Sequence, residues 1–302
     1  MDLRQVGYVL AVVDEGGFTR GARAAHVAQP SLSQAVRTVE RELGVELFQR
    51  AGRQVRLTAA GVAFVEAARV VMRDVATLHA AVDAVRGVVE GTLDLVALPT
   101  LAVDPLAALL GRYRRAFPGV TVRVAQPEDT GTATGLVQRG DSEVALTELP
   151  VPDALVTHPL EVQELVVVLP PGDPLARGRG PLALERLAGV ALVATPVGTS
   201  TRTIIDNAFA GAALRADVRV EIDQREAILP LVLNGAGAAF LPRSLAAEAE
   251  LRGASVRRLR PVLSRRIGLA HRAGVLSPAA RAFVDLAVPD ATLGSYARVA
   301  SP

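Results

Sequence analysis

This chain of 302 residues has no cysteine and no lysine, so its 33 basic residues are all arginine. Without cysteine the chain can form no disulfide, no thiolate zinc finger and no thiol redox sensor. Without lysine it cannot supply the amine of a Walker phosphate loop or of a Schiff-base enzyme. These absences exclude several large classes of protein before any pattern is considered.

Long apolar runs are missing as well. No run approaches the roughly 20 residues of a membrane-spanning helix. The opening segment, residues 1–16, has neither the basic start nor the cleavage site of a signal peptide. We therefore expect a cytoplasmic protein without membrane contact.

Patterns for catalysis and metal binding are scarce. The four histidines, His26, His79, His158 and His271, are dispersed, and none belongs to a metal pair such as HExxH. The segment GTSTR at 198–202 lacks the final glycine of a GxSxG nucleophile elbow. We expect each histidine to be an ordinary surface or core residue, and we expect no enzyme, no metal site and no cofactor.

Half of the residues are apolar, so the chain can bury a large core and is long enough for two or three domains. The formal net charge is only +2, but residues 16–57 carry seven arginines against three glutamates, an excess of four positive charges. A local basic surplus of this kind is typical of a compact surface that binds nucleic acid.

Residues 18–58 are typical of two short helices joined by a tight turn and followed by a basic hairpin. In the second helix, apolar residues at spacings of four, three and four share one face. These residues are Leu32, Val36, Val39 and Leu43. The opposite face, which follows Pro30, is hydrogen-bonding and cationic, and such a face can enter a DNA major groove.

A polar helix face is more often solvated surface than a DNA-reading surface, so the context decides. The segment 19–25 is short and alanine-rich, residues 26–28 form a turn, and arginines flank Gly52 in the hairpin. Together these features predict a winged helix-turn-helix whose second helix reads DNA and whose wing contacts the backbone or minor groove. The candidate DNA-binding residues are Thr19, Gln29, Ser31, Ser33, Gln34, Arg37, Arg50 and Arg53.

A longer motif runs in register through residues 16–61. Its elements are AA at 24–25, Gln29-Pro30, Leu32-Ser33, Glu40, Leu43-Gly44, Leu47-Phe48, Arg50, Leu57-Thr58 and Gly61. In these positions the chain resembles the LysR-type transcriptional regulators, and so many matches over some forty residues are specific. The chain departs from the family at Gly17 and Ala28, where a helix-capping serine or threonine is common. We expect the loss at Ala28 to weaken the reading helix by about 1 kcal/mol.

Residues 58–86 contain no proline and only one glycine, Gly61, which favours one long helix. Apolar residues recur there at alternating spacings of four and three, as in a heptad seam. The seam consists of Phe64, Ala68, Val71, Val75, Leu78, Val82 and Val85. Such a stripe often packs on its own domain, but a long helix between domains is expected to pair with its copy in a second subunit. The LysR resemblance implies the same dimerising helix.

After the break at residues 87–91, strand-like and helical segments alternate, which predicts a mainly parallel sheet with helices on its faces. Strands are expected at 93–98, 120–125, 143–147, 190–195, 218–222, 235–242 and 265–271, and helices at 105–117, 134–139, 202–209, 225–234 and 278–287. Within residues 160–174 a further strand is expected to carry the chain into a second lobe.

The predicted fold class is therefore α/β, with an N-terminal winged helix-turn-helix, a long linker helix and a two-lobed effector domain that resembles a periplasmic binding protein. The expected DNA-binding domain is 1–58, the linker or dimerisation helix 59–87 and the effector-binding domain 88–302. Lobe 1 is expected at about 88–162 and 266–302, and lobe 2 at about 163–265. LysR-type regulators have this architecture.

Ligands of open α/β sheets lie beyond the carboxyl ends of strands, near helix N-termini that favour anions. Three such ends are rich in hydroxyl groups, although each alone is more often an ordinary cap or turn. The candidate effector-binding residues are Thr100, Thr132, Thr147, Thr199, Ser200, Thr201 and Arg202. Because hydroxyl and amide donors and one arginine gather there, we expect a small anionic effector, a carboxylate.

We therefore expect a sequence-specific DNA-binding transcription regulator that is controlled by a small-molecule effector. Its expected partners are double-stranded DNA, further copies of itself in a homodimer or homotetramer, and RNA polymerase. The alternative is an intracellular small-molecule binding protein or enzyme with a vestigial helix-turn-helix. A secreted solute receptor would share the cleft, but the DNA-reading segment and the missing signal peptide oppose that interpretation.

Overall fold

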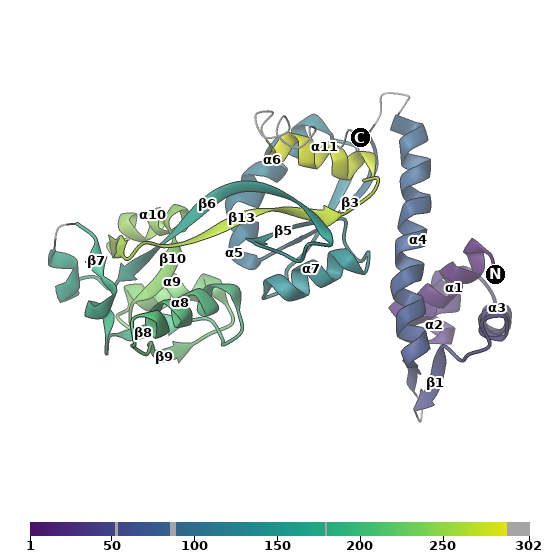
Figure 1. The fold of residues 1–302 in the computed structure, drawn as a ribbon, viewed down its shortest axis with the longest axis horizontal. Coiled ribbons are helices and arrows are strands. Elements are labelled where there is room, and N and C mark those ends of the chain that lie inside the picture. Colours follow the sequence, from purple (N-terminus) through teal and green to yellow (C-terminus); the bar gives the residue numbers. More distant parts are fainter. Residues whose placement is uncertain (52–53, 85–88, 179, 289–302) are drawn as a thin grey trace.

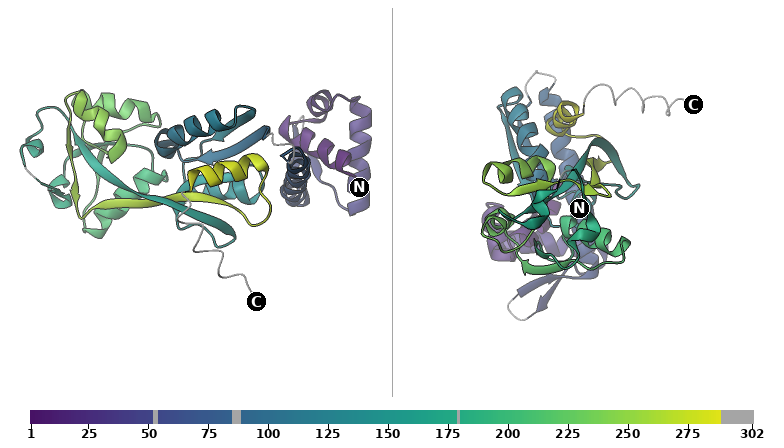
Figure 2. Two further views of the ribbon diagram at one scale, coloured as in Figure 1. Left: turned by 90° about the horizontal axis from the view of Figure 1, so that it is seen from above. Right: turned by 90° about the vertical axis from the view of Figure 1, so that its left-hand side faces the viewer.

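The computed structural model describes residues 1–51, 54–84, 89–178 and 180–288 (Figure 1). Its parts follow one another along the long axis. The N-terminal helices lie at one end, the long helix α4 comes next, and two α/β lobes follow, an order that holds in both Figure 1 and the left panel of Figure 2.

The N-terminal domain is built from three helices and a hairpin. These are α1 (Leu3–Asp14), α2 (Phe18–Ala24), α3 (Gln29–Leu43), β1 (Phe48–Ala51) and β2 (Gln54–Leu57). The hairpin strands pair antiparallel, and one apolar core joins all three helices to Leu47. Helices α1 and α2 approach closely because Gly21 has no side chain: a Cβ there would lie 2.8 Å from the carbonyl oxygen of Ala11. The predicted helix-turn-helix and hairpin are confirmed.

Helix α4 (Ala59–Ala84) is the predicted long linker, and its 26 residues span roughly 40 Å at 1.5 Å per residue. Thr58 caps its start, since the Thr58 hydroxyl accepts a hydrogen bond from the backbone N–H of Gly61 at 3.0 Å. The helix contacts α1 on one side and α11 (Pro278–Ala287) of an α/β lobe on the other. It therefore stands between the N-terminal domain and the α/β lobes.

The first lobe contains three parallel strands with helices on their faces. Its elements are β3 (Gly91–Ala97), α5 (Pro99–Leu101), a π-helical turn (Ala102–Leu106), α6 (Ala107–Ala116), β4 (Val120–Ala125), α7 (Thr130–Gln138), β5 (Val144–Leu149) and the late helix α11 (Pro278–Ala287). Strand β3 pairs in parallel with both β4 and β5. Helix α7 begins four residues before its predicted start, because Asp129 caps it by accepting from the N–H of Thr132 at 2.8 Å.

The second lobe follows the first along the chain. Its elements are β7 (Leu182–Ala183), β8 (Ala191–Ala194), α8 (Ser200–Gly211), β9 (Asp217–Glu221), α9 (Ile228–Leu233), β10 (Ala239–Pro242), α10 (Arg243–Leu251), β11 (Ser255–Arg257) and β12 (Leu259–Arg260), with 3-10 turns at Pro174–Arg177, Leu184–Leu187 and Arg225–Ala227. Strands β8 and β9 are parallel, as their strand-helix-strand spacing predicts.

Two long strands connect the lobes: β6 (Leu155–Leu169) leaves the first lobe and β13 (Leu263–Arg272) returns to it. They pair antiparallel over ten residue pairs. The sheet order is β10-β6-β13-β5-β3-β4, and β11 also pairs with β6. The expectation of a mainly parallel sheet was wrong. Pairing is parallel within the strand-helix-strand units, and antiparallel wherever a crossover strand takes part.

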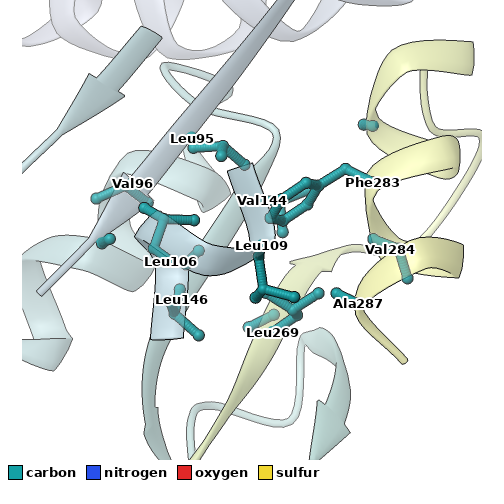
Figure 3. Close-up of a cluster of buried hydrophobic side chains, with 14 of the residues drawn as sticks. Leu95, Val96, Leu106, Leu109, Val144, Leu146, Leu269, Phe283, Val284 and Ala287 are labelled. Atoms are coloured by element: carbon teal, nitrogen blue, oxygen red, sulfur yellow. The ribbon is translucent and has the colours of Figure 1, made fainter. Parts of the chain in front are cut away.

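Helix α11, which follows the return of the chain from the second lobe, completes the core of the first lobe. Figure 3 shows Phe283 of α11 directed toward Val144, and the side chains of Phe283, Val284, Val144 and Leu109 are all buried. Tyr113 of α6 adds a polar link, because its hydroxyl donates to the carbonyl oxygen of Ala279 at 2.8 Å. Residues from both ends of the domain sequence therefore form one core.

Candidate DNA interface and effector cleft

Helix α3 has one buried and one open face. Leu32, Val36 and Val39 are almost completely buried, as predicted. The predicted fourth core residue, Leu43, is 43% exposed. It lies in the last turn, just before Gly44 ends the helix in a left-handed conformation with φ +70°, so the chain turns away before Leu43 can reach the core.

The other face of α3 is accessible. The side chains of Gln29, Ser31, Gln34 and Arg37 are exposed, and Ser33 is half-buried. The amide of Gln29 donates to the hydroxyl of Ser33 at 3.0 Å. Thr19, the candidate on α2, is exposed as well. The predicted DNA-binding residues of the two helices therefore lie outside the protein core.

The start of α3 has no side-chain cap. Ala28 stands at the cap position and makes no side-chain hydrogen bond to the helix. The first backbone N–H groups of a helix have no partner within the helix, so they need water or an anion. A DNA phosphate is such an anion, because it also gains from the positive end of the helix dipole.

The wing is fixed to α3 by one carboxylate. Glu40 accepts hydrogen bonds from the backbone N–H groups of Leu47 at 2.9 Å and Phe48 at 3.3 Å. This contact gives Glu40, a motif residue, a structural role. Of the two candidate wing residues, Arg53 lies outside the described residues and the side chain of Arg50 is not described.

The predicted seam on α4 divides into two parts. Phe64 packs against the core of the N-terminal domain and Ala68 is buried. Farther along, Val75 is half-buried. The remaining described residues of the stripe are exposed: Val71 by 45%, Leu78 by 61% and Val82 by 59%. Val85 lies outside the described residues. The first part of the stripe thus serves the chain's own core, and the second part is an apolar surface.

A cleft of about 730 Å³ lies between the lobes and is lined from both sides. Thr100 and Glu128 line it from the first lobe, and Thr195, Thr201 and Arg225 from the second. Arg225 crosses the cleft to pair with Glu128, with Nη1 3.2 Å from Oε1. The N–H of Ser200, at the start of α8, donates to the carbonyl oxygen of Glu128 at 3.0 Å. These contacts hold the two lobes together.

Arg265 is the centre of a polar network that adjoins this cleft at Thr100. It comes from the crossover strand β13, and its side chain is only 3% exposed. It donates to Glu148 at 2.9 Å, to Ser200 at 3.2 Å and to Thr100 at 2.7 Å. Gln163 of β6 accepts a further bond at 2.9 Å. Burial lowers the pKa of Arg265, and the Glu148 carboxylate opposes that shift by favouring the charged form.

The candidate effector residues fall into two groups. Thr100 and Ser200 both accept from Arg265, and Thr201 lines the cleft. Thr199 is buried and donates to the carbonyl oxygen of Pro196 at 2.9 Å. The structure therefore brings the residues at 99–100 and 199–201 together at the cleft.

The other candidates bond within their own lobes. The hydroxyl of Thr132 donates to its helix cap Asp129 at 2.7 Å. Thr147 is fully buried, and its hydroxyl donates to that of Thr130 at 3.2 Å. Arg202 pairs with Asp206 and Glu221, each at 3.0 Å. The positive charge expected from Arg202 is thus paired within the second lobe, while Arg225 lines the cleft and pairs with Glu128 across it.

Sequence reasoning missed Arg265, although the sequence carries a signal for it. Leu263, Arg265, Ile267 and Leu269 alternate along β13 and are all buried. An arginine on the apolar face of a strand is unusual, because burying its charge requires acceptors. Gln163, which also alternates with buried residues on β6, is its neighbour in register. Together the two positions mark a buried polar site.

In the part of the chain that the structure describes, no helix is both long and apolar enough to cross a membrane. Among the same residues, no cluster of three or more histidine, aspartate or glutamate side chains could hold a metal ion.

Two protein-family models match separate parts of the chain. Residues 3–62 match the bacterial regulatory helix-turn-helix protein of the lysR family, and residues 86–291 match the LysR substrate binding domain. The RuBisCO operon transcriptional regulator of Allochromatium vinosum is 30% identical over 96% of this chain and 97% of its own length. The transcriptional activator CmpR of Synechocystis is 29% identical over 79% of this chain and 78% of its own.

Solved structures give the same result. A full-length OxyR variant from Pseudomonas aeruginosa is similar with a TM-score of 0.78 at 25% identity, covering 95% of this chain and 94% of its own. CbnR, solved with its target DNA, shares the fold with a TM-score of 0.67 at 23% identity, over 95% of this chain and 99% of its own.

The chain belongs to the LysR family of transcriptional regulators. It is a DNA-binding transcription regulator with a winged helix-turn-helix and a two-lobed effector-binding domain, and both parts of the predicted fold class are confirmed. The named relatives are regulators of transcription.

Proposed function

We propose that this regulator binds a small anionic effector, a carboxylate, in the cleft between its lobes, and that the effector alters how a homodimer binds its operator. The observation that carries this proposal is the convergence of Thr100, Ser200 and Arg265 from three different segments of the chain. The regulator works without catalysis, metal or cofactor.

The chemistry of the cleft supports an anion. Arg265 presents a guanidinium, which suits the planar geometry of a carboxylate. Ser200 and Thr201 begin α8, a helix of 12 residues whose positive dipole end faces the cleft. Thr199 packs behind them and holds this loop in place. Arg202, Thr132 and Thr147 act as supporting residues in this proposal, because their hydrogen bonds stay within one lobe.

For DNA, the proposal assigns base reading to Ser33, Gln34 and Arg37 on α3. Amide and guanidinium groups recognise base edges in pairs of hydrogen bonds. Thr19, Gln29 and Ser31 are assigned to phosphates around the start of α3, where the amides lack a cap. The wing residues Arg50 and Arg53 are assigned to the DNA backbone or minor groove.

The exposed apolar stripe of α4 supports the formation of a homodimer. Val71, Leu78 and Val82 are large apolar residues in water on a single copy, and pairing with a second copy of α4 would bury them. The first part of the predicted seam, Phe64 and Ala68, is assigned to the chain's own domain. A dimer presents two reading helices, so it can bind two half-sites of an operator.

The same proposal divides the chain into the DNA-binding domain 1–58, the linker 59–87 and the effector domain 88–302, with lobe 2 at about 163–265. A regulator of this kind acts in the cytoplasm, where it meets DNA and RNA polymerase.

The experiment compares wild type with a Ser200→Ala, Thr201→Ala double variant. Metabolites are screened on the full chain by thermal shift, and each hit is tested for its effect on binding to the DNA upstream of the chain's own gene. The proposal expects carboxylates among the hits. It also expects the double variant to keep its fold and operator affinity while losing the effector's influence.

A matched control is Thr203→Ala. Thr203 lies on the same helix, and its hydroxyl donates to the carbonyl oxygen of Thr199 at 3.0 Å, so this change should leave the response intact. Hits that are cationic or wholly apolar, and that bind the double variant as tightly as wild type, would contradict the anionic cleft.

A further inference from the structure

The polar network beside the effector cleft already holds a carboxylate, and it belongs to the chain itself. Glu148 stands at the end of β5 in the first lobe. It accepts from Nη1 of Arg265 at 2.9 Å and from the hydroxyl of Ser200 in the second lobe. It therefore contacts two of the groups to which the proposed function assigns the effector's anionic group.

Every N–H group of the Arg265 guanidinium already donates a hydrogen bond. It carries five N–H groups, and five hydrogen bonds are formed from it. Nε and Nη2 donate to Gln163, Nη1 donates to Glu148 and Ser200, and Nη2 also donates to Thr100. A further anion can reach Arg265 only if one of these four acceptors leaves.

Glu148 is the acceptor whose departure admits an anion. It is the charged one of the four, so an anion that bound beside it would face a like charge at close range. Its side chain is 21% exposed, so the carboxylate can move into water. Gln163 is only 5% exposed and is fixed on the paired strand β6.

We propose that Glu148 is a built-in competitor of the effector. Its carboxylate occupies the anion position between Arg265 and Ser200, and the anionic group of the effector takes that position by displacing it. This proposal rests on the proposed function, because it assumes that the cleft binds an anion.

Competition of this kind sets the selectivity of the site. Glu148 is tethered beside Arg265, so its effective concentration there is high. A simple carboxylate in solution displaces it poorly. An effector succeeds when the rest of the molecule gains contacts in the cleft of about 730 Å³. Displacement also breaks the direct contact between Glu148 of lobe 1 and Ser200 of lobe 2, so the effector must replace that link.

The test uses the full chain and acetate as the probe, with binding measured by calorimetry and thermal shift at constant ionic strength. In Glu148→Gln the competitor keeps its shape and loses its charge, and charge-assisted hydrogen bonds are about twice as strong as neutral ones. We therefore expect acetate to bind at least about tenfold more tightly to Glu148→Gln than to wild type. Adding Ser200→Ala to this variant should remove most of the gain.

The matched control is Glu164→Gln. Glu164 also pairs with two arginines, Arg258 at 2.7 Å and Arg243 at 3.4 Å, but these are its partners in place of Arg265 and Ser200. Acetate affinity should therefore stay at the wild-type value in this variant. Circular dichroism establishes that each variant is folded.

If Glu148→Gln does not fold, Glu148→Asp replaces it. The shorter side chain draws the carboxylate back from Ser200, and we expect a smaller gain of the same sign. Equal acetate affinity in wild type and in a folded Glu148 variant overturns the proposal, as does an equal gain in Glu164→Gln. The proposed function stands in those cases if the Ser200→Ala, Thr201→Ala variant still loses its effector response.

Discussion

Arg69 and Asp141 form an ion pair at 2.9 Å between the linker helix and the effector domain. The same arginine pairs at 2.6 Å with Asp14 at the end of α1. One turn farther along α4, Arg73 donates to the carbonyl oxygen of Gly140 at 2.8 Å and pairs with Asp94 at 3.3 Å. Two arginines on one face of α4 thus connect the effector domain to the linker, and Arg69 connects both to the DNA-binding domain.

The first prediction is that Arg69→Gln loosens this junction without unfolding either domain. The pairs are partly exposed, so each contributes less than about 1 kcal/mol to stability. Hydrogen exchange should speed up for the amides of α4 near residue 69 and for the loop around Asp141, and should stay unchanged in α11. Arg252→Gln removes the exposed pair with Glu248 in lobe 2 and should alter neither region. Unchanged exchange in Arg69→Gln would show that the junction is held by packing alone.

The second prediction concerns reading of the operator. Arg37→Ala should lose roughly 1 to 3 kcal/mol of binding free energy on the cognate operator and much less on random DNA, because base contacts act only on the matching sequence. Arg56→Ala, at an exposed position of the wing strand β2, should weaken both to a similar extent. Gel shifts at one salt concentration measure the affinity of each of the two variants for the operator and for random DNA. Equal losses on the two DNAs for Arg37→Ala would remove it from base reading.

The third prediction concerns the exposed stripe of α4. Replacing Leu78 and Val82 with glutamate sets like charges against one another in the proposed dimer seam. Dimers should dissociate, and operator affinity should fall because the second half-site is lost. Val62→Glu serves as the control, since Val62 is 46% exposed on the same helix but lies off the heptad stripe. A sedimentation coefficient that is the same in all three proteins would place the subunit contact elsewhere.

The fourth prediction is a pH dependence that arises from two histidines. The Nε2 atoms of His158 and His271 lie 3.0 Å apart. Nδ1 of His271 lies 2.7 Å from the carbonyl oxygen of Arg272, so that nitrogen carries the proton and Nε2 is left to accept from His158. Burial lowers the pKa of both histidines, and the positive charge of Arg281 lowers each further. The hydrogen bond of His271 to the Arg272 backbone raises the pKa of His271, and the carboxylates of Asp285 and Glu143 also act upward, but each of these influences is weaker than burial.

The two histidines make the folded state less stable as the pH falls. Both folded pKa values lie below the ordinary value of 6.5, so the unfolded chain binds more protons as the pH falls through that region. The stabilisation is therefore present above about pH 6.5 and is lost below it. Wild type should lose more thermal stability between about pH 7.5 and pH 5.5 than His158→Gln does. His26→Gln, at an exposed turn residue, should follow wild type, and a pH profile of His158→Gln that is identical to wild type would contradict the assignment.

Local sequence patterns predicted the elements that depend on one stretch of chain. The strand 120–125 and the helix 278–287 were predicted with their observed bounds, because alternation and helical periodicity are properties of neighbouring residues. The seven-stranded mixed sheet depends on how β6 and β13 return between the lobes, which no local pattern encodes. Leu43 was misplaced for a related reason: its spacing fits the core face, but the helix ends beside it.

The candidate effector site was predictable in part. Hydroxyl-rich helix starts identified Thr100 and Ser200, which the structure brings together. Arg265 and Glu148 come from strands far away in the sequence, so their meeting is a property of the crossover. Arg202 was chosen because it is next to those hydroxyls in sequence. Its side chain turns toward Asp206 and Glu221 instead.

The last prediction tests the joint between the wing and the linker. A Cβ on Gly61 would lie 2.0 Å from the carbonyl oxygen of Leu47 and 2.9 Å from the side chain of Leu57. Because the first contact is with backbone, Gly61→Ala must move the wing or the start of α4, at a cost of about 1 to 3 kcal/mol in the free energy of unfolding. Operator affinity should fall with it, since Leu47 and Leu57 flank the wing.

Gly7→Ala is the matched control for this change. Gly7 lies within α1, and a Cβ there meets nothing within 4 Å, so alanine should stabilise the domain by about 0.5 to 1 kcal/mol through its better helix propensity. Thermal unfolding of the two variants should therefore shift the midpoint in opposite directions from wild type. If Gly61→Ala matches or exceeds the wild-type midpoint, the close approach of α4 to the wing is not a constraint, and Gly61 has no packing role at this joint.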